Sequence, residues 1–267
     1  MKRTWLRWGL MTLFVVALGF TFVQLGQWQL DRLDQRRDRN ATTAEHEKAP
    51  VRPFEEVFTG TITDADQWQR VSVSGTFLAD KQLQARYRSF DGKTGWELIT
   101  PLRTTSGQVV LVDRGFVERP AGQDFPKVFP DPPAGEVQLT GYVRRNEQGN
   151  TNQMTPTENT VRLVNSDTLS GALGLDLVNG FIALIDVTPA QSAELVPVTP
   201  PPPTEGPHQS YALQWFAFAA IAVVGLFILI RNDLRDRKRA KERAARPAPV
   251  EPAVERTEEA SHGPRAD

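Results

Sequence analysis

The chain contains no cysteine in its 267 residues, and this absence removes several classes of function at once. Disulfide frameworks, thiolate catalysis and cysteine-based zinc sites all need that side chain. Methionine is nearly as scarce, with three residues, so a copper chaperone that relies on sulfur ligands is not expected. A domain outside the cytoplasm would have to be held together by its hydrophobic core alone.

Histidine is also rare, being limited to His46, His208 and His262. His46 lies in a charged segment where solvent exposure is expected, and His262 lies in a polar tail. No His-Glu-x-x-His, Gly-x-Ser-x-Gly or Walker sequence is present. We therefore expect no enzyme activity. The net charge of −1 gives no reason to expect nucleic acid as a partner.

Two long uncharged runs, Trp8–Leu30 and Gln209–Ile230, do stand out. A helix needs roughly 20 apolar residues to cross the hydrocarbon layer of a bilayer. The sequence thus predicts transmembrane helices at residues 9–28 and 210–230, after a short N-terminus at 1–8. Gln27, Trp28 and Gln29 follow the first run where a signal peptidase site would need small residues, so this run is read as an uncleaved anchor.

Charge predicts the orientation of these helices. Residues 231–246 carry eight Lys or Arg against three acids, which indicates a cytoplasmic C-terminus. Arginines also follow the first run, but two spans force both termini onto one side, and the C-terminal cluster is the stronger signal. Residues 29–195 should then be extracytoplasmic. No organellar targeting segment precedes the first span, which favours a bacterial plasma membrane.

The region between the spans is typical of a β-rich domain. Arg70–Phe77 alternates polar and apolar residues, as half-buried strands do, and Thr105–Gln108 is typical of a hairpin turn. Ser166–Leu175 predicts a helix capped by Ser166 or Asp167. The fold class is thus a membrane protein with two transmembrane α-helices flanking a β-rich (α+β) domain, an antiparallel barrel or sandwich. The other expected strands are 82–87, 96–103, 109–117, 137–143 and 181–187.

Two polar segments complete the pattern. Residues 196–207 are rich in proline, which predicts a stiff extended connector, favoured here over a docking ligand for a proline-recognition module. Residues 231–267 are charged and lack an apolar period, so a disordered cytoplasmic tail is expected.

Candidate site residues lie where the two spans meet the polar region. His208 precedes Tyr211 and Trp215 at helical spacing, and histidine is a common metal or haem ligand. Trp28 and Arg32 lie four residues apart at the end of the first span, where Arg32 could bind a carboxylate or a lipid phosphate. An interfacial anchor with no ligand is the alternative for both segments.

A further motif places charge inside an apolar strand. Leu111–Val117 holds Asp113, Arg114 and Gly115 among apolar residues. This pattern predicts a β-bulge with a buried or surface ion pair, and a structural role is favoured.

Five segments in order resemble the Surfeit locus protein 1 family, the membrane-bound assembly factors of haem–copper cytochrome oxidase. One departure from the family pattern is Asp113, where these proteins usually have asparagine. The resemblance covers roughly residues 9–231. The matching segments are GQWQLDRL (26–33), ITPL (99–102), LVDRGFV (111–117), GEVQLTGYVR (135–144) and HQSYALQWF (208–216).

The resemblance implies a non-enzymatic role in helping haem a reach oxidase subunit I. His208 would be the iron ligand, Tyr211 and Trp215 would cover the ring, and Trp28 with Arg32 would complete the site. Haem a synthase and the lipid bilayer are further implied partners. The alternative is a cofactor-free membrane scaffold that docks on an oxidase assembly intermediate and stabilises it.

Overall fold

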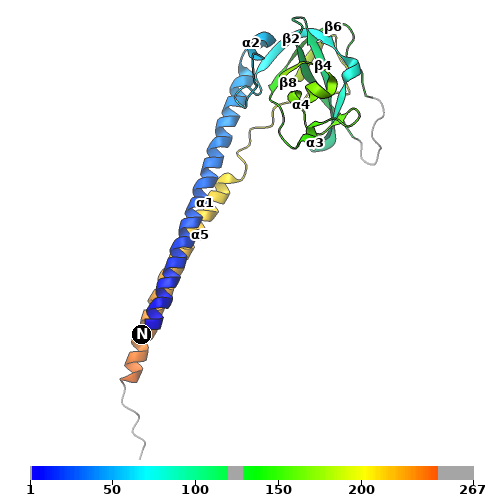
Figure 1. Cartoon of the computed structure of the whole chain (residues 1–267). Coiled ribbons are helices and arrows are strands. Elements are labelled where there is room, and N and C mark those ends of the chain that lie inside the picture. The colour runs from blue at the N-terminus through cyan, green and yellow to red at the C-terminus, as the bar shows by residue number, and fades with distance from the viewer. Residues whose placement is uncertain (1, 120–128, 246–267) are drawn as a thin grey trace, which may run out of the picture. The chain divides into compact units, whose positions relative to one another are not determined.

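The computed structural model describes residues 2–119 and 129–245 (Figure 1). They divide into two compact units. The first, here called the helical unit, consists of the described residues up to Arg32 and from Pro207 onward. The second, here called the β-rich domain, is Leu33–Gly206. The predicted arrangement of two long apolar helices flanking a β-rich domain is therefore confirmed.

Two long helices, α1 (Lys2–Lys48) and α5 (His208–Ala244), contain the apolar runs. Both are long and apolar enough to cross a membrane by length and composition, and only 6% of each most apolar window is buried. Side chains such as Phe14 and Phe227 are thus exposed along the helices, as a lipid-facing surface requires. The expected disorder of 231–267 is wrong for 231–244, which continue α5, and residues 246–267 lie outside the described part.

The β-rich domain is built on one mixed sheet with the strand order β1-β2-β6-β8-β5-β4-β3-β7. Strand β2 also pairs with β4, so β2, β6, β8, β5 and β4 form a closed ring of hydrogen-bonded pairs. The strands are β1 (Arg52–Pro53), β2 (Arg70–Phe77), β3 (Leu83–Phe90), β4 (Lys93–Thr104), β5 (Val109–Glu118), β6 (Glu136–Arg144), β7 (Thr160–Val161) and β8 (Leu177–Thr188).

The expected antiparallel pairing is confirmed only in part. Strand β4 pairs antiparallel with β3 and with β5, and the predicted turn at 105–108 joins β4 to β5. Strands β5 and β8, however, pair parallel, as do β3 with β7 and β1 with β2. The connection from β5 to β8 is long and includes α4, which allows the parallel pairing.

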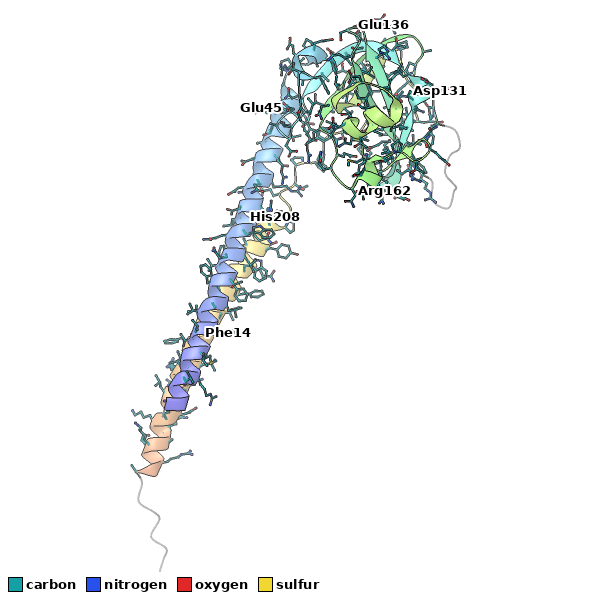
Figure 2. The ribbon with its side chains drawn as sticks, in the orientation of Figure 1. Phe14, Glu45, Asp131, Glu136, Arg162 and His208 are labelled. Carbon is teal, nitrogen blue, oxygen red and sulfur yellow. The ribbon has the colours of Figure 1, made fainter. Side chains whose placement is uncertain are left out.

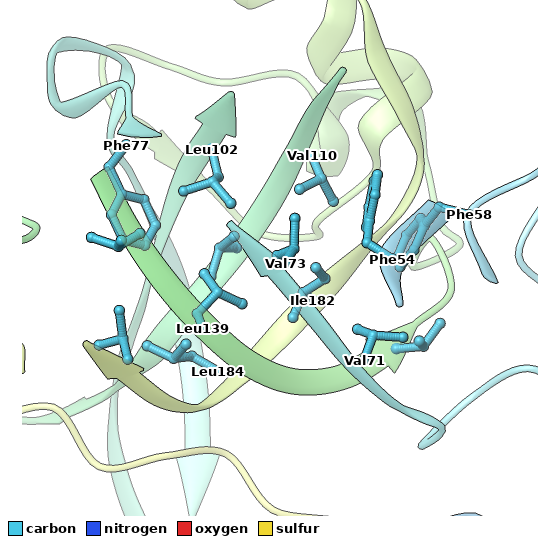
Figure 3. Close-up of a cluster of buried hydrophobic side chains, with 14 of the residues drawn as sticks. Phe54, Phe58, Val71, Val73, Phe77, Leu102, Val110, Leu139, Ile182 and Leu184 are labelled. Carbon is cyan, nitrogen blue, oxygen red and sulfur yellow. The ribbon is translucent and has the colours of Figure 1, made fainter. Parts of the chain in front are cut away.

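The ring encloses the main hydrophobic core (Figure 3). Alternate residues of β2, among them Val71, Val73 and Phe77, are buried because successive strand side chains point to opposite faces. Phe54 from the short helix α2 (Phe54–Val57) stacks on Phe58, with ring centroids 4.6 Å apart, and joins the same core. With no cysteine, this burial is the main stabilising term of the domain.

A second core lies around helix α4 (Ser166–Leu173), with Leu169 and Phe181 among its members. The helix is capped by Asn165, whose side chain accepts a hydrogen bond from the Thr168 N–H, so the expected Ser166 or Asp167 cap is wrong. Ser166 is buried instead, and its hydroxyl accepts a hydrogen bond from the Gly180 N–H and donates one to the side-chain oxygen of Asn146. The remaining short elements are η1 (Ala79–Lys81) and α3 (Thr151–Met154).

The pairing of β4 with β5 shifts register between Ile99↔Asp113 and Glu97↔Phe116, which confirms the predicted bulge. Asp113 and Arg114 are both buried there, but the expected ion pair between them is wrong, because they do not pair with each other. Arg114 donates to the side chains of Gln82 and Gln191 and to the carbonyls of Pro130 and Asp131. Burial lowers its pKa to about 10. Asp113 accepts a hydrogen bond from the Gly115 N–H. Adjacent strand residues face opposite ways, which is why the two charges separate.

Candidate functional site

His208, the metal or haem ligand suggested by the sequence, is hydrogen-bonded to a residue of the other long helix. His208 is the first residue of α5 and lies beside α1 (Figure 2). Its Nδ1 lies 2.9 Å from the Oε1 of Gln29 in α1. Because an amide oxygen only accepts hydrogen bonds, Nδ1 is the donor in this contact, and in the tautomer that makes it the lone pair lies on Nε2.

The two helices approach closely one turn away from this hydrogen bond. Gly26 is buried, and a side chain there would run into the Phe216 ring, whose nearest atom would lie 2.6 Å from the added Cβ. Ala212, one turn after His208, is also buried. Small residues at these positions let the backbones of α1 and α5 come near each other, which brings Gln29 within reach of His208.

Trp215 lies in the same contact between the helices. Its ring stacks on Phe22 of α1 with centroids 5.7 Å apart, and it meets Phe218 edge-on at 5.9 Å. Trp215 therefore helps to hold α1 and α5 together. A position two turns after His208 puts it on the same helical stripe.

The other three predicted residues lie at the surface of the helical unit. Trp28 and Tyr211 have 49% and 47% of their surface exposed. The Arg32 guanidinium lies over the Trp28 ring, 5.5 Å from its centroid, as their four-residue spacing predicts. His208 and Trp215 thus each contact α1, Arg32 lies over Trp28 on α1, and Tyr211 presents an exposed aromatic face.

This arrangement can offer one neutral nitrogen ligand and nearby aromatic surface. Metal-binding histidines usually donate their second ring N–H to a fixed acceptor, and Gln29 is such an acceptor for His208. Within residues 2–119 and 129–245, no group of three His, Asp or Glu residues could hold a metal ion. His208 by itself can offer one nitrogen ligand from this site.

Gln29 is a site residue that the sequence pattern alone does not identify. A signal for it was present, because Gln29 is the glutamine of the Gly-x-Trp-Gln segment at 26–29, but its partner lies 179 residues away. His46, expected to be solvent exposed, is half-buried and its Nδ1 lies 2.7 Å from the Gln67 carbonyl oxygen. His262 lies outside the described residues.

Known proteins resemble this chain over a range that includes both Gln29 and His208. The model of the SURF1 family matches residues 16–220. Over 256 residues, 92% of each chain, the sequence is 30% identical to an uncharacterized SURF1-like protein of Mycobacterium tuberculosis. It is 27% identical over 230 residues to a SURF1-like protein of Rickettsia conorii, covering 83% of this chain and 91% of that one.

A third relative has a more informative name. The chain is 27% identical over 123 residues to the cytochrome oxidase assembly protein SHY1 of Saccharomyces cerevisiae. This match covers 43% of the chain and 30% of the yeast protein.

Proposed function

Because the chain belongs to the SURF1 family, we propose that it takes part in the assembly of cytochrome oxidase and that His208 holds haem a during this process. The name of the yeast relative supports the first part. The hydrogen bond between His208 and Gln29 is the observation that carries the second part. No catalytic step is required of the protein.

The imidazole of His208 fits haem because its protonated nitrogen is already engaged. With Nδ1 donating to Gln29, the lone pair on Nε2 would be available to ligate the haem iron. When bound, haem a would supply that iron. Gln29 would keep the ring in one tautomer and one orientation, which would strengthen the bond from His208 to the iron. A bond from one protein ligand can still be broken when the cofactor is released.

Aromatic and charged groups beside His208 suit the rest of such a cofactor. Tyr211 lies one turn after His208 and exposes an aromatic face, and Trp28 exposes another on α1. Arg32 carries a guanidinium that can pair with a carboxylate in a two-pronged geometry. These residues would bind and orient the cofactor, and a single protein ligand suits a carrier that must also release it.

We further infer that the protein spans the plasma membrane of a bacterium twice, with both termini in the cytoplasm and the β-rich domain outside. Two long apolar helices and the basic segment after Ile230 support this topology. The partners expected from the function are oxidase subunit I or its assembly intermediates, and haem a synthase as the source of the cofactor.

The test is the absorption spectrum of the full-length protein purified from cells that make haem a. The wild type should show a Soret band, and His208→Ala should lose most of it. His46→Ala is the matched control, since His46 contacts a backbone carbonyl of the β-rich domain, and it should keep the band. An unchanged Soret band in His208→Ala would overturn the ligand assignment.

One observation favours the alternative of a cofactor-free scaffold. The His208–Gln29 hydrogen bond and the stacking of Trp215 on Phe22 join α1 to α5 by themselves, with no cofactor needed. In a strain lacking the gene, His208→Ala would then restore the haem a content of subunit I and co-purify with it. Loss of haem a from subunit I, with co-purification intact, would favour the haem-binding role.

A further inference from the structure

The β-rich domain contains a cleft of about 770 Å³ that the proposed function does not use. Its walls are of two kinds. Aromatic residues, Trp68, Tyr87 and Phe181 among them, and the proline-rich segment 198–202 form the apolar surface. The charged residues Arg88, Glu97, Arg144 and Glu147 form the polar surface. A volume of this size is typical of small-molecule sites, which usually combine apolar walls with a few polar groups.

The two arginines of the cleft are paired differently. Arg88 makes an ion pair with Glu97 at 2.8 Å and a two-pronged pair with Glu147, at 3.0 and 2.8 Å. Arg144 has no ion pair or hydrogen bond to any residue in the described ranges, and its Nε is buried without a partner. A partly buried guanidinium usually has a carboxylate or phosphate partner, because desolvation of the charge is costly.

Aromatic rings hold the Arg144 guanidinium in place. It lies 4.3 Å from the centroid of the Trp68 ring and 5.4 Å from that of Phe181. Stacking of this kind covers the faces of the planar group and leaves its N–H edges as the donors. Arg144 is thus oriented by the fold, although no anion among the described residues takes its hydrogen bonds.

The positive and negative charges of the cleft are not evenly matched in space. Asp113 lies within electrostatic reach of Arg88 and Arg144, but burial and, second, the Glu97 carboxylate raise the pKa of Asp113 well above its ordinary value, which favours its neutral form. Two guanidinium groups and two carboxylates then remain, and both carboxylates lie on Arg88. The positive end of the cluster is Arg144, so an anion is best placed there.

The backbone around the cleft is unusual as well. Four residues other than glycine have a positive φ in the described ranges, and three of them line the cleft: Trp68 (68°), Tyr87 (62°) and Asp91 (49°). A register shift in β3 between Ala85 and Arg88 accompanies the second. Asp91 and Gly92 form the two-residue turn between β3 and β4, where a positive φ is normal, so the unusual backbone is that of Trp68 and Tyr87. A positive φ is uncommon for bulky aromatic residues, and at these two positions it aims side chains that line the cleft.

We propose that this cleft binds an amphipathic carboxylate, with the carboxylate on Arg144 and a flat apolar body between the aromatic residues and the proline-rich segment. The unpaired guanidinium, the aromatic walls and the strained backbone each support this ligand class. The site is separate from His208 and does not depend on haem binding there.

Two probes that differ only in charge test the proposal: 2-naphthoate and its neutral analogue 2-naphthamide. Each is titrated into the full-length protein in detergent, with protein-free micelles as the blank, by isothermal titration calorimetry. The wild type should bind the carboxylate at least tenfold more tightly than the amide. Equal affinities, or no saturable binding of 2-naphthoate, would overturn the proposal.

Three variants locate the binding. Arg144→Gln should weaken 2-naphthoate at least tenfold and leave 2-naphthamide unchanged. Arg145→Gln removes the neighbouring arginine, which pairs with Asp64, and should behave as wild type. His208→Ala should also behave as wild type, which separates a failure of this proposal from a failure of the haem assignment. An Arg144→Gln protein with wild-type affinity for 2-naphthoate would rule the site out.

If Arg144→Gln does not fold, a variant at an exposed residue of the cleft can test the same site. Ser89 is exposed and lines the cleft, so Ser89→Glu should fold normally and place a carboxylate near the ligand. It should weaken 2-naphthoate severalfold without affecting 2-naphthamide. If Ser89→Glu left the affinity for 2-naphthoate unchanged, the proposed cleft would not be the binding site.

Discussion

At the scale of single residues, the buried carboxyl of Asp113 should make the stability of the β-rich domain depend on pH. Burial, and second the nearby Glu97, raise the pKa of Asp113 well above normal. The unfolded chain releases this proton above about pH 4, whereas the folded domain keeps it. Stability should therefore fall as the pH rises from about 4 through the pKa of the folded state.

Asp113→Asn tests this expectation, because asparagine keeps the oxygen that accepts from the Gly115 N–H and cannot ionise. Thermal unfolding followed by circular dichroism at pH 5 and pH 8 should show a smaller difference in Tm for Asp113→Asn than for wild type. Asp176→Asn changes an exposed carboxylate and should keep the wild-type difference. An identical pH response of Asp113→Asn and wild type would contradict the expectation.

Gln29 gives a second prediction at this scale. Replacing it by leucine removes the acceptor that fixes the His208 tautomer. Loss of such a partner typically weakens metal binding by roughly 10–100-fold. If His208 binds haem a, Gln29→Leu should purify with a much smaller Soret absorbance per protein, while Gln27→Leu, exposed on the same helix, should not. Equal absorbance in the two variants would count against the role of Gln29.

At the scale of the elements, closure of the strand ring depends on the close approach of β2 to β4. Gly75 pairs with Thr104 there, and an added Cβ would collide with the backbone carbonyl of Arg103. A backbone atom cannot move aside as a side-chain end can. We expect Gly75→Ala to lower the free energy of unfolding by about 1–3 kcal/mol, the usual cost of overpacking.

Urea unfolding of the full-length protein, followed by tryptophan fluorescence, measures this change. Gly60→Ala is the control, because nothing lies within 4 Å of a Cβ added at Gly60. It should unfold like the wild type. A Gly75→Ala protein as stable as Gly60→Ala would mean that β2 and β4 can separate at little cost.

Local patterns were enough to predict the larger elements. The alternation over Arg70–Phe77 coincides with β2, four of the other expected strands lie within β4, β5, β6 and β8, and the strand expected at 82–87 overlaps β3 from residue 83 onward. Strands β1 and β7 have only two residues each, too few for a period to show. The parallel pairing of β5 with β8 could not be predicted either, since no local pattern encodes which distant strands meet.

The site shows the same limit. His208, Trp215, Trp28 and Arg32 could be named from residue type and helical spacing, and the Trp28–Arg32 contact follows from that spacing. The Gln29–His208 hydrogen bond joins two helices, and the unpaired state of Arg144 depends on where Glu97 and Glu147 lie. Such features are set by tertiary contacts, which one sequence does not display.

At the scale of the whole molecule, the absence of cysteine makes the proposed topology easy to test. Single cysteines can be placed at Ser106, exposed in the β4–β5 turn, and at Ala240, exposed near the end of α5. A maleimide that does not cross membranes should label Ser106→Cys in spheroplasts, and Ala240→Cys only after the membrane is permeabilised. Labelling of both sites in intact spheroplasts would contradict cytoplasmic termini.

The hydrogen bond between Gln29 and His208 also determines how much of the chain must be synthesised before the two residues can meet. These residues are 179 positions apart, and the second belongs to the last described helix. A nascent chain exposes Gln29 early but acquires its partner only after α5 has been made. If His208 holds haem a as proposed, a polypeptide that stops short of α5 lacks this histidine and cannot bind the cofactor there.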